Sequence, residues 1–172
     1  SFVGDEDDFK NPENLRRIEL VIKYANSHNI HGLAGLPALM RELNRNIGDV
    51  DELPSSRAAI SQLLLLVEDD SDSGVSRLVN DDFSHARVFG NSPDIGAMGF
   101  IKLRQKIEDY CKTVFEGTTI KGHVTGVATV AAAAFIGLIQ ELLLSLLSAL
   151  IVIMGVVAFV FRDIKMAIAG LL

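Results

Sequence analysis

The chain has 172 residues, of which 49% are hydrophobic and 22% are charged, and its formal net charge at pH 7 is −6. This apolar content excludes a disordered chain, which needs low hydrophobicity together with high net charge. The acidic balance argues against nucleic-acid binding, which needs a basic surface for the phosphates. The single cysteine excludes an internal disulfide framework.

The charged residues are unevenly distributed along the chain. Residues 1–123 contain 20 acidic and 14 basic side chains, whereas residues 124–172 contain two of each. Within residues 124–161, Glu141 is the only charged residue. The sequence therefore predicts a water-soluble acidic domain over residues 1–123, followed by an apolar tail.

Residues 11–28 carry the start signals and the periodicity of an amphipathic helix. Asn11 can accept a hydrogen bond as the N-cap, and Pro12 fits the first helical position. Apolar residues then recur every three or four positions, at Leu15, Ile18, Ile22 and Ala25. This stripe predicts a helix with one face on a core.

Two further helices are predicted after this one. The glycine-punctuated stretch 31–36 is a loop or a short strand. Pro37 then opens a small helix that ends near Gly48, and after a loop Ser55 or Ser56 can cap a third helix. The apolar residues of the third helix share one face: Ile60, Leu63, Leu64 and Val67.

An acidic, serine-rich stretch, residues 68–74, follows the third helix and is interpreted as a solvated loop. A divalent-ion site is the alternative there, although the spacing does not fit an EF-hand loop. Residues 75–80 and 84–90 are predicted to form two strands of a hairpin. The intervening Asp81 and Asp82 suit its turn.

Residues 93–115 show the strongest helical amphipathicity in the chain. Ser92 can cap this helix, Pro93 takes the first position and Asp94 suits the first turn. Its apolar stripe consists of Phe100, Leu103, Ile107, Tyr110 and Val114. We expect the stripe to pack on the domain's own sheet, with a partner helix as the alternative, and the neighbouring cysteine to be a small packed residue.

The stretch 116–126 turns and then runs as a strand into the tail. A helix, a hairpin, a long helix and a strand follow one another in the domain. This order predicts an α+β fold, with helices on one face of a sheet, of the split βαβ kind.

No catalytic or cofactor-binding motif is recognisable in the sequence. There is no phosphate-binding glycine loop, no nucleophile motif and no His, Cys and carboxylate cluster at ligand spacing. His28 and His31 are three residues apart, but they straddle a helix end, and His85 is a lone strand histidine that we expect to be solvated rather than a ligand or a base. We therefore predict no catalytic, cofactor-binding or metal-binding residue, and no enzyme.

Residues 142–161 are predicted to span a membrane. These twenty residues contain no charged side chain. As a helix they cover about 30 Å, the thickness of the hydrocarbon core of a bilayer. The alternative is a buried helix of a larger soluble protein. Residues 124–141 are expected to continue the same helix out of the membrane, with Glu141 at the headgroups; a functional carboxylate at membrane depth is the alternative.

The last residues predict a short loop and a second span. Arg162 and Lys165 place the loop 162–165 in the cytoplasm by the positive-inside rule, which leaves residues 1–123 in the periplasm. Residues 166–172 look like the beginning of another membrane helix. Since the chain also starts without Met, we expect it to be part of a longer, multi-pass protein.

Three stretches resemble the large extracytoplasmic loop of the resistance-nodulation-division (RND) exporters, particularly those of the MMPL type. Residues 8–28 resemble the helix that opens that loop, and residues 77–96 resemble the segment before its long amphipathic helix. Residues 123–130, leading into 142–172, are similar to the passage from the porter domain to the next membrane helix. The resemblance covers nearly the whole chain.

The resemblance implies a ferredoxin-like porter subdomain followed by a transmembrane helix, taken from the second half of a two-halved transporter. Such proteins use the proton gradient to export hydrophobic or amphiphilic compounds, including lipids, and the resemblance places this one in a bacterial inner membrane. Their proton-relay residues lie on helices absent from this chain, so none can be assigned here. The implied partners are the lipid bilayer, the substrate and the remaining transmembrane helices, with a homo-oligomer left open. The competing hypothesis is an extracytoplasmic binding or sensor domain with its own anchor; for a membrane-bound hydrolase the sequence offers no residues.

Overall fold

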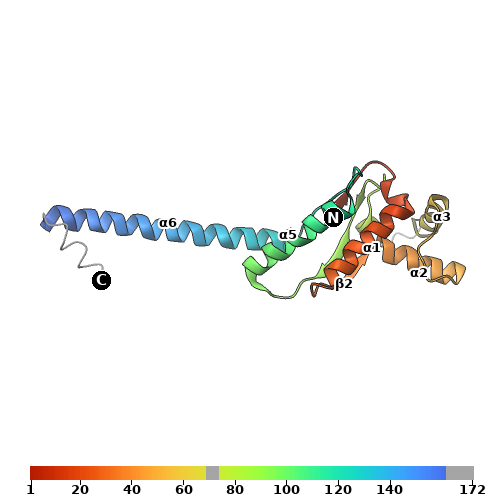
Figure 1. Ribbon diagram of the computed structural model, residues 1–172, viewed down its shortest axis with the longest axis horizontal. Helices are drawn as coiled ribbons and strands as arrows, with labels where there is room; N and C mark the ends of the chain where they lie inside the picture. Colours follow the sequence, from red (N-terminus) through yellow and green to blue (C-terminus); the bar gives the residue numbers. More distant parts are fainter. Residues whose placement is uncertain (69–73, 162–172) are drawn as a thin grey trace. The chain divides into compact units, whose positions relative to one another are not determined.

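The computed structural model describes residues 1–68 and 74–161 (Figure 1). The chain divides into two compact units, Ser1–Thr129 and Val130–Leu172. The first unit mixes helices with short antiparallel strands, and the second is helical over its described residues. This confirms the predicted α+β class with a long apolar helix after it.

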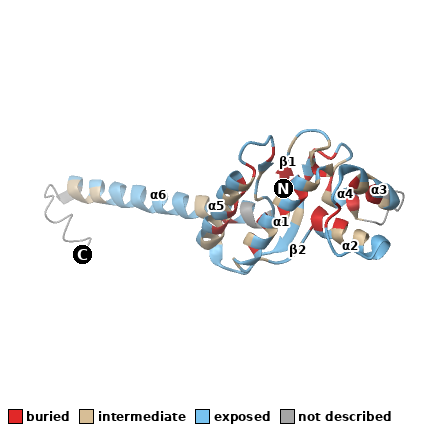
Figure 2. Ribbon diagram, turned by 45° about the vertical axis from the view of Figure 1, so that its right-hand side comes forward, coloured by how far each residue is buried: buried red, intermediate tan, exposed pale blue. Residues whose placement is uncertain are grey.

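The first long helix, α1 (Pro12–Asn26), begins where the sequence predicts. The side chain of Asn11 accepts a hydrogen bond from the backbone N–H of Glu13 at 3.0 Å, and the proline occupies the first turn. Leu15 and Ile18 are completely buried, as the apolar stripe predicts. The capped end and the buried stripe together fix this helix on the core (Figure 2).

Two helices follow, α2 (Leu36–Gly48) and α3 (Arg57–Glu68). The hydroxyl of Ser56 accepts a hydrogen bond from the N–H of Ala59 at 3.2 Å, so Ser56 rather than Ser55 caps α3. Ile60, Leu63 and Leu64 are buried on one face of α3, in agreement with the predicted stripe. A short 3-10 helix, η1 (Asp8–Lys10), packs against both α1 and α3.

The strands form two small antiparallel sheets. In the first, β1 lies between β3 and β5; in the second, β2 pairs with β4. Their bounds are β1 Phe2–Val3, β2 His31–Gly35, β3 His85–Ala86, β4 Val88–Asn91 and β5 Lys121–Gly122. Arg87 alone separates β3 from β4, so one continuous segment pairs with β1 through its first residues and with β2 through its last.

The predicted hairpin over residues 75–80 and 84–90 is wrong in its first strand. Residues Val75–Leu78 form a single helical turn, α4, and only Val79 makes an isolated bridge, to Ala86. Gly74, with φ +70°, starts this helical turn. Ala86 therefore has two partners, Val79 through the isolated bridge and Phe2 of β1 (Phe2–Val3), which pairs with β3 (His85–Ala86). The predicted turn at residues 81–82 is present.

The second long helix, α5 (Gly96–Val114), begins three residues later than the predicted Pro93. Ser92 does not cap it, because its hydroxyl donates to the carbonyl of Pro93 at 3.2 Å. Gly96 has φ +68°, a left-handed conformation that interrupts helical geometry before this point. Leu103 and Ile107 are buried, and α5 packs on strand β5 (Lys121–Gly122), in line with the expected packing on the sheet. It also packs on helix α1, a contact that was not predicted.

The last helix, α6 (Val127–Phe161), begins three residues after the predicted residue 124. It is continuous from there, so the small-residue stretch upstream does extend the apolar helix as predicted. Within it, Val130–Phe159 is long and apolar enough to cross a membrane, and the side chains of residues 141–153 are all exposed. These 30 residues cover about 45 Å, more than the hydrocarbon core of a bilayer. The headgroup position of Glu141 stays a prediction.

Three other sequence-based expectations fall on or extend into parts of the chain outside the described residues. These are most of the acidic stretch 68–74, the basic loop 162–165 and the second membrane helix expected at 166–172. They stay predictions.

Truncation of one leucine of α1 should show how much the unit depends on this helix. Leu15 is 0% exposed and Leu20 is 47% exposed. We expect Leu15→Ala to lower the free energy of unfolding by about 2–5 kcal/mol, since it leaves a cavity, and Leu20→Ala by about 1 kcal/mol or less. Urea unfolding followed by tyrosine fluorescence measures the first unit alone, because both tyrosines, Tyr24 and Tyr110, lie in it. Equal losses in the two variants would contradict the assignment of Leu15 to the core.

Candidate functional site

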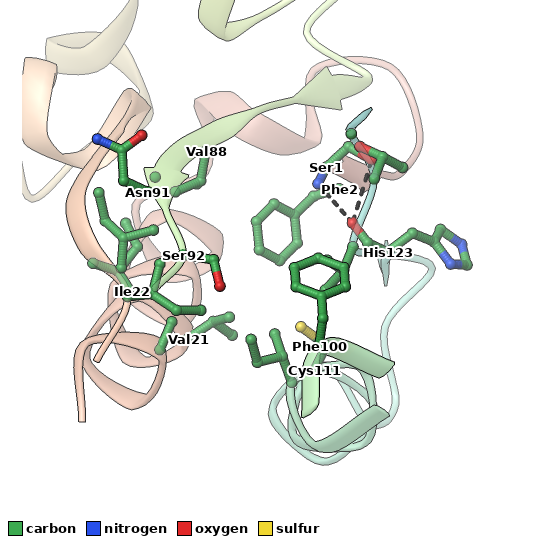
Figure 3. A pocket seen from close by; sticks show the side chains of 18 residues that line it. Ser1, Phe2, Val21, Ile22, Val88, Asn91, Ser92, Phe100, Cys111 and His123 are labelled. Atoms are coloured by element: carbon green, nitrogen blue, oxygen red, sulfur yellow. Dashed lines mark hydrogen bonds between the residues drawn. The ribbon is translucent and has the colours of Figure 1, made fainter. Parts of the chain in front are cut away.

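The first unit contains an apolar cavity of about 410 Å³. Figure 3 shows its walls: side chains of α1 and β4 line one side, and side chains of α5, β1 and the segment after β5 line the other. The lining residues are Ser1, Phe2, Val21, Ile22, Ala25, Ile30, Leu33, Val88, Gly90, Asn91, Ser92, Phe100, Ile107, Cys111, His123, Val124, Thr125 and Gly126. The cavity thus lies between the β2–β4 pair on one side and β1 with the segment after β5 on the other.

The cavity is lined mainly by apolar side chains. Among the described residues, no Lys, Arg, Asp or Glu borders the cavity. The polar lining side chains are those of Ser1, Asn91, Ser92, His123 and Thr125, and the imidazole of His123 points away from the space (Figure 3). The volume falls within the range of small-molecule pockets, about 300–1,000 Å³. Such a lining suits an apolar group. The N-terminal ammonium of Ser1, which also borders the cavity, donates a hydrogen bond to the carbonyl oxygen of His123 at 2.7 Å.

Two glycines allow the walls to approach closely. A Cβ at Gly90 would lie 2.5 Å from Cδ2 of Leu33, and a Cβ at Gly122 would lie 2.8 Å from Sγ of Cys111. Both distances are too short for a real contact, so a side chain at either position would displace a wall residue. The rings of Phe2 and Phe115, 5.5 Å apart between centroids, fill the space beneath β1.

Cys111 lies in the cavity wall and is almost completely buried. Burial raises the pKa of its thiol to about 11. The sulfur is therefore protonated at neutral pH and behaves as a small apolar side chain, which confirms the packed residue expected from the sequence.

Glu108 fixes the segment between β5 and α6, a role that the sequence analysis did not find. Its carboxylate oxygen Oε1 accepts two hydrogen bonds. One comes from the backbone N–H of Val124 at 3.1 Å, and the other comes from Nε of Arg104 at 3.0 Å. The backbone of His123 is in turn hydrogen-bonded to that of Ser1. An i, i+4 pair of Arg and Glu on a helix normally predicts only a solvated ion pair, so nothing in the sequence signals the contact with residue 124.

Two of the three histidines considered in the sequence, His28 and His85, lie within hydrogen-bonding distance of neighbouring residues. Nδ1 of His28 lies 3.0 Å from the carbonyl oxygen of Tyr24, and Nδ1 of His85 lies 2.8 Å from the hydroxyl of Ser84. His31 lies on β2. Over residues 1–68 and 74–161, no three His, Cys, Asp or Glu side chains come together in a group that could hold a metal ion.

The comparisons with known proteins returned no match. No protein-family model matches the chain, and neither the search of curated proteins nor that of solved structures found a similar one. The cavity and helix α6 are therefore the features from which a function can be inferred.

The thiol of Cys111 should react slowly and in a pH-dependent manner. With a pKa of about 11 in place of 9.0, its thiolate at neutral pH is about a hundredfold rarer than that of an ordinary cysteine. We expect maleimide labelling at pH 7 to be slower by at least this factor than in a Cys111→Ser, Lys102→Cys variant, whose thiol is on the exposed face of the same helix. The rate should rise as the pH approaches 11. Equal labelling rates at pH 7, measured by mass spectrometry, would contradict the buried thiol.

Proposed function

We propose that the chain is part of a proton-driven membrane transporter of the RND superfamily, of the MMPL type, that exports hydrophobic or amphiphilic compounds such as lipids. One observation carries the proposal. Only four residues separate β5 of the cavity-bearing α+β unit from α6, which contains a stretch long and apolar enough to cross a membrane. A domain with an apolar cavity is thereby tied closely to a membrane helix, as the resemblance to the exporters implies.

The strand pairing supports a ferredoxin-like, split βαβ porter subdomain. Counted through Arg87 as one strand, β3 and β4 give the order β5, β1, β3/β4, β2, with antiparallel neighbours throughout. Helix α1 connects β1 to β2, and α5 connects β4 to β5. Each connection therefore skips one intervening strand, which is the defining feature of a split βαβ unit. On this view, α2, α3 and α4 are an insertion between the second and third strands.

Within the transporter, this part of the chain would form the substrate path and transmit movement to the membrane helices. We place the coupling in the segment His123–Gly126, which Glu108 holds through Val124. A rigid connection transmits displacement, whereas a flexible one absorbs it. The proton relay itself would lie on other helices of the full-length protein.

A flexible linker in the segment His123–Gly126 should uncouple the α+β unit from helix α6. We expect a Gly-Ser insertion between Thr125 and Gly126 of the full-length protein to abolish export while membrane insertion stays normal. The same insertion after Val50, in the loop between α2 and α3, is the matched control and should retain export. Accumulation of a fluorescent amphiphile in cells measures the effect. Wild-type export from the first insertion would overturn the coupling role.

The second candidate is a membrane-anchored extracytoplasmic binding or sensor domain. It is favoured by the presence of one candidate span among the described residues, next to a domain with a cavity. The full-length coding sequence separates the two candidates. Two similar sets of several spans support the exporter, whereas one or two spans in total support the anchored domain.

The orientation is part of the proposal: residues 1–123 in the periplasm of a bacterium, and the chain in its inner membrane. The supporting residues are Arg162 and Lys165, which favour the cytoplasmic side. We expect a green fluorescent protein fused after Lys165 to be bright and an alkaline phosphatase fused at the same point to be inactive. A phosphatase placed after Gly117, in the α+β unit, should be active. Phosphatase activity after Lys165 would reverse the orientation.

A further inference from the structure

The β3–β1–β5 sheet has one buried face and one exposed face. Phe2 and Ala86 are buried, whereas the next residues in register, Val3 and His85, are exposed, and so is Lys121. Val3 pairs with His85 on one side and with Lys121 on the other. Since successive residues of a strand point to opposite faces, these three exposed side chains lie in one row across the sheet.

A second row lies beside the first on the same exposed face. Its middle residue is Ser1, which exchanges backbone hydrogen bonds with His123. The register of β1 with β3, extended by one residue, places Arg87 on the other side of Ser1. Burial lowers the pKa of the Ser1 ammonium, and the nearby positive charge of Arg87 acts in the same direction. The imidazole of His123 points away from the cavity, as a position on this face requires (Figure 3).

The ends of the two rows form what we call the basic face, with four exposed basic side chains at its corners. The corner residues are Lys121, His85, His123 and Arg87. Neighbouring strands lie about 4.8 Å apart and alternate residues of a strand about 7 Å apart, so the corners enclose roughly 10 Å by 7 Å. Over residues 1–68 and 74–161, none of the four forms an ion pair with an acidic side chain.

Two acidic residues lie close in sequence or contact to one end of the basic face, and both carboxylates have other partners. Asp82 accepts a hydrogen bond from the hydroxyl of Ser84 at 2.7 Å. Asp8 accepts one from the hydroxyl of Thr119 at 3.0 Å and one from the N–H of Asp5 at 2.8 Å. The basic face therefore keeps its positive charge available to a partner, although the chain as a whole carries −6.

An aromatic side chain extends this surface. Phe89 follows Arg87 by two residues and is 49% exposed, whereas the intervening Val88 lines the cavity on the opposite face. Phe89 pairs with Ala34 of β2, which is exposed as well. An apolar contact is thus offered about 7 Å beyond the second row of the basic face.

The spacing of these groups matches an extended polypeptide, in which alternate side chains are also about 7 Å apart. With such a segment lying along β1, one carboxylate would fit between Lys121 and His85. The carboxylate two residues further would fit between His123 and Arg87, so each would meet one permanent cation and one imidazole. The side chain two residues further again would reach Phe89.

From this we infer that the basic face, together with Phe89, is a docking surface for an extended acidic segment of another protein, with the pattern acidic-x-acidic-x-apolar. A nucleic acid fits less well, because the net charge of −6 repels a long polyanion, whereas a segment with few carboxylates needs only local complementarity. The inference does not depend on the proposed transport function.

A peptide with this pattern in both directions tests the docking surface. The probe is fluorescein-labelled Glu-Thr-Glu-Thr-Leu-Thr-Glu-Thr-Glu, and the control peptide has glutamine in place of each glutamate. Fluorescence anisotropy measures the binding of each to the full chain in nanodiscs of phosphatidylcholine, whose head group is zwitterionic. Arg87→Gln with Lys121→Gln removes one cation from each carboxylate position. Lys102→Gln with Lys106→Gln removes the same charge from the exposed side of α5 and is the matched control.

We expect saturable binding of the glutamate peptide, weakened by added salt, and no binding of the glutamine peptide over the same concentrations. The Arg87→Gln, Lys121→Gln variant should raise the dissociation constant about fivefold, as expected for two exposed ion pairs, and the α5 control should leave it unchanged. Phe89→Ala should raise it about threefold, but not for a peptide in which serine replaces the leucine. Circular dichroism checks that each variant is folded.

Equal binding of the two peptides, or equal losses in the two double variants, would overturn the docking surface. Binding of a labelled oligodeoxythymidylate in place of the peptide would assign the basic face to nucleic acid and would also overturn the inference. So would a dimer in detergent solution, detected by analytical ultracentrifugation, that the Arg87→Gln, Lys121→Gln variant dissociates, since a second copy would then cover the face. Peptide binding is measured without transport, so its failure is distinct from a failure of the transporter proposal.

Discussion

The pairing of β1 with β3 on one side and β5 on the other holds the α+β unit together. Two residues near the beginning of the chain, Phe2 and Val3, thereby contact segments more than eighty residues away. The side chain of Phe2 is buried against Phe115, so the pairing brings apolar burial as well as backbone hydrogen bonds. Closing such long loops costs entropy, and the burial of α1 and α5 on the same core offsets that cost.

The cavity is a consequence of the same pairing. Because β1 pairs with β3 and β2 pairs with β4, the segment that contains both β3 and β4 changes partner at Arg87. The cavity lies between β1 and the β2–β4 pair. Helices α1 and α5 border it, and their apolar faces do not fill it. Glycines at positions 90 and 122 bring the remaining walls close, and the buried thiol of Cys111 adds a neutral surface. An apolar site thus arises from geometry rather than from a sequence motif.

The surfaces of the two units differ in polarity and therefore suit different solvents. Residues 1–123 contain nearly all the charged side chains, and they bury their apolar residues in a core of their own. The exposed surface of α6 is aliphatic over many turns, which is unfavourable in water and favourable in lipid. The proposed function joins these two facts: a charged domain with an apolar cavity is connected to a helix long and apolar enough to cross a membrane.

Local physical chemistry let the sequence by itself determine the presence of the longer helices, the α+β class and the apolar tail. The cap at Asn11, the stripe of α3 and the continuity of α6 follow from hydrogen bonding and periodicity within a few residues. The tertiary structure alone decided the rest. A strand of two residues has no alternation to detect, so the sequence did not predict β1. The apolar residues of 75–80 predicted a strand, whereas Val75–Leu78 form a helical turn. The cavity and the contact of Glu108 with Val124 likewise depend on which distant segments meet, and that choice is made by packing over the whole core.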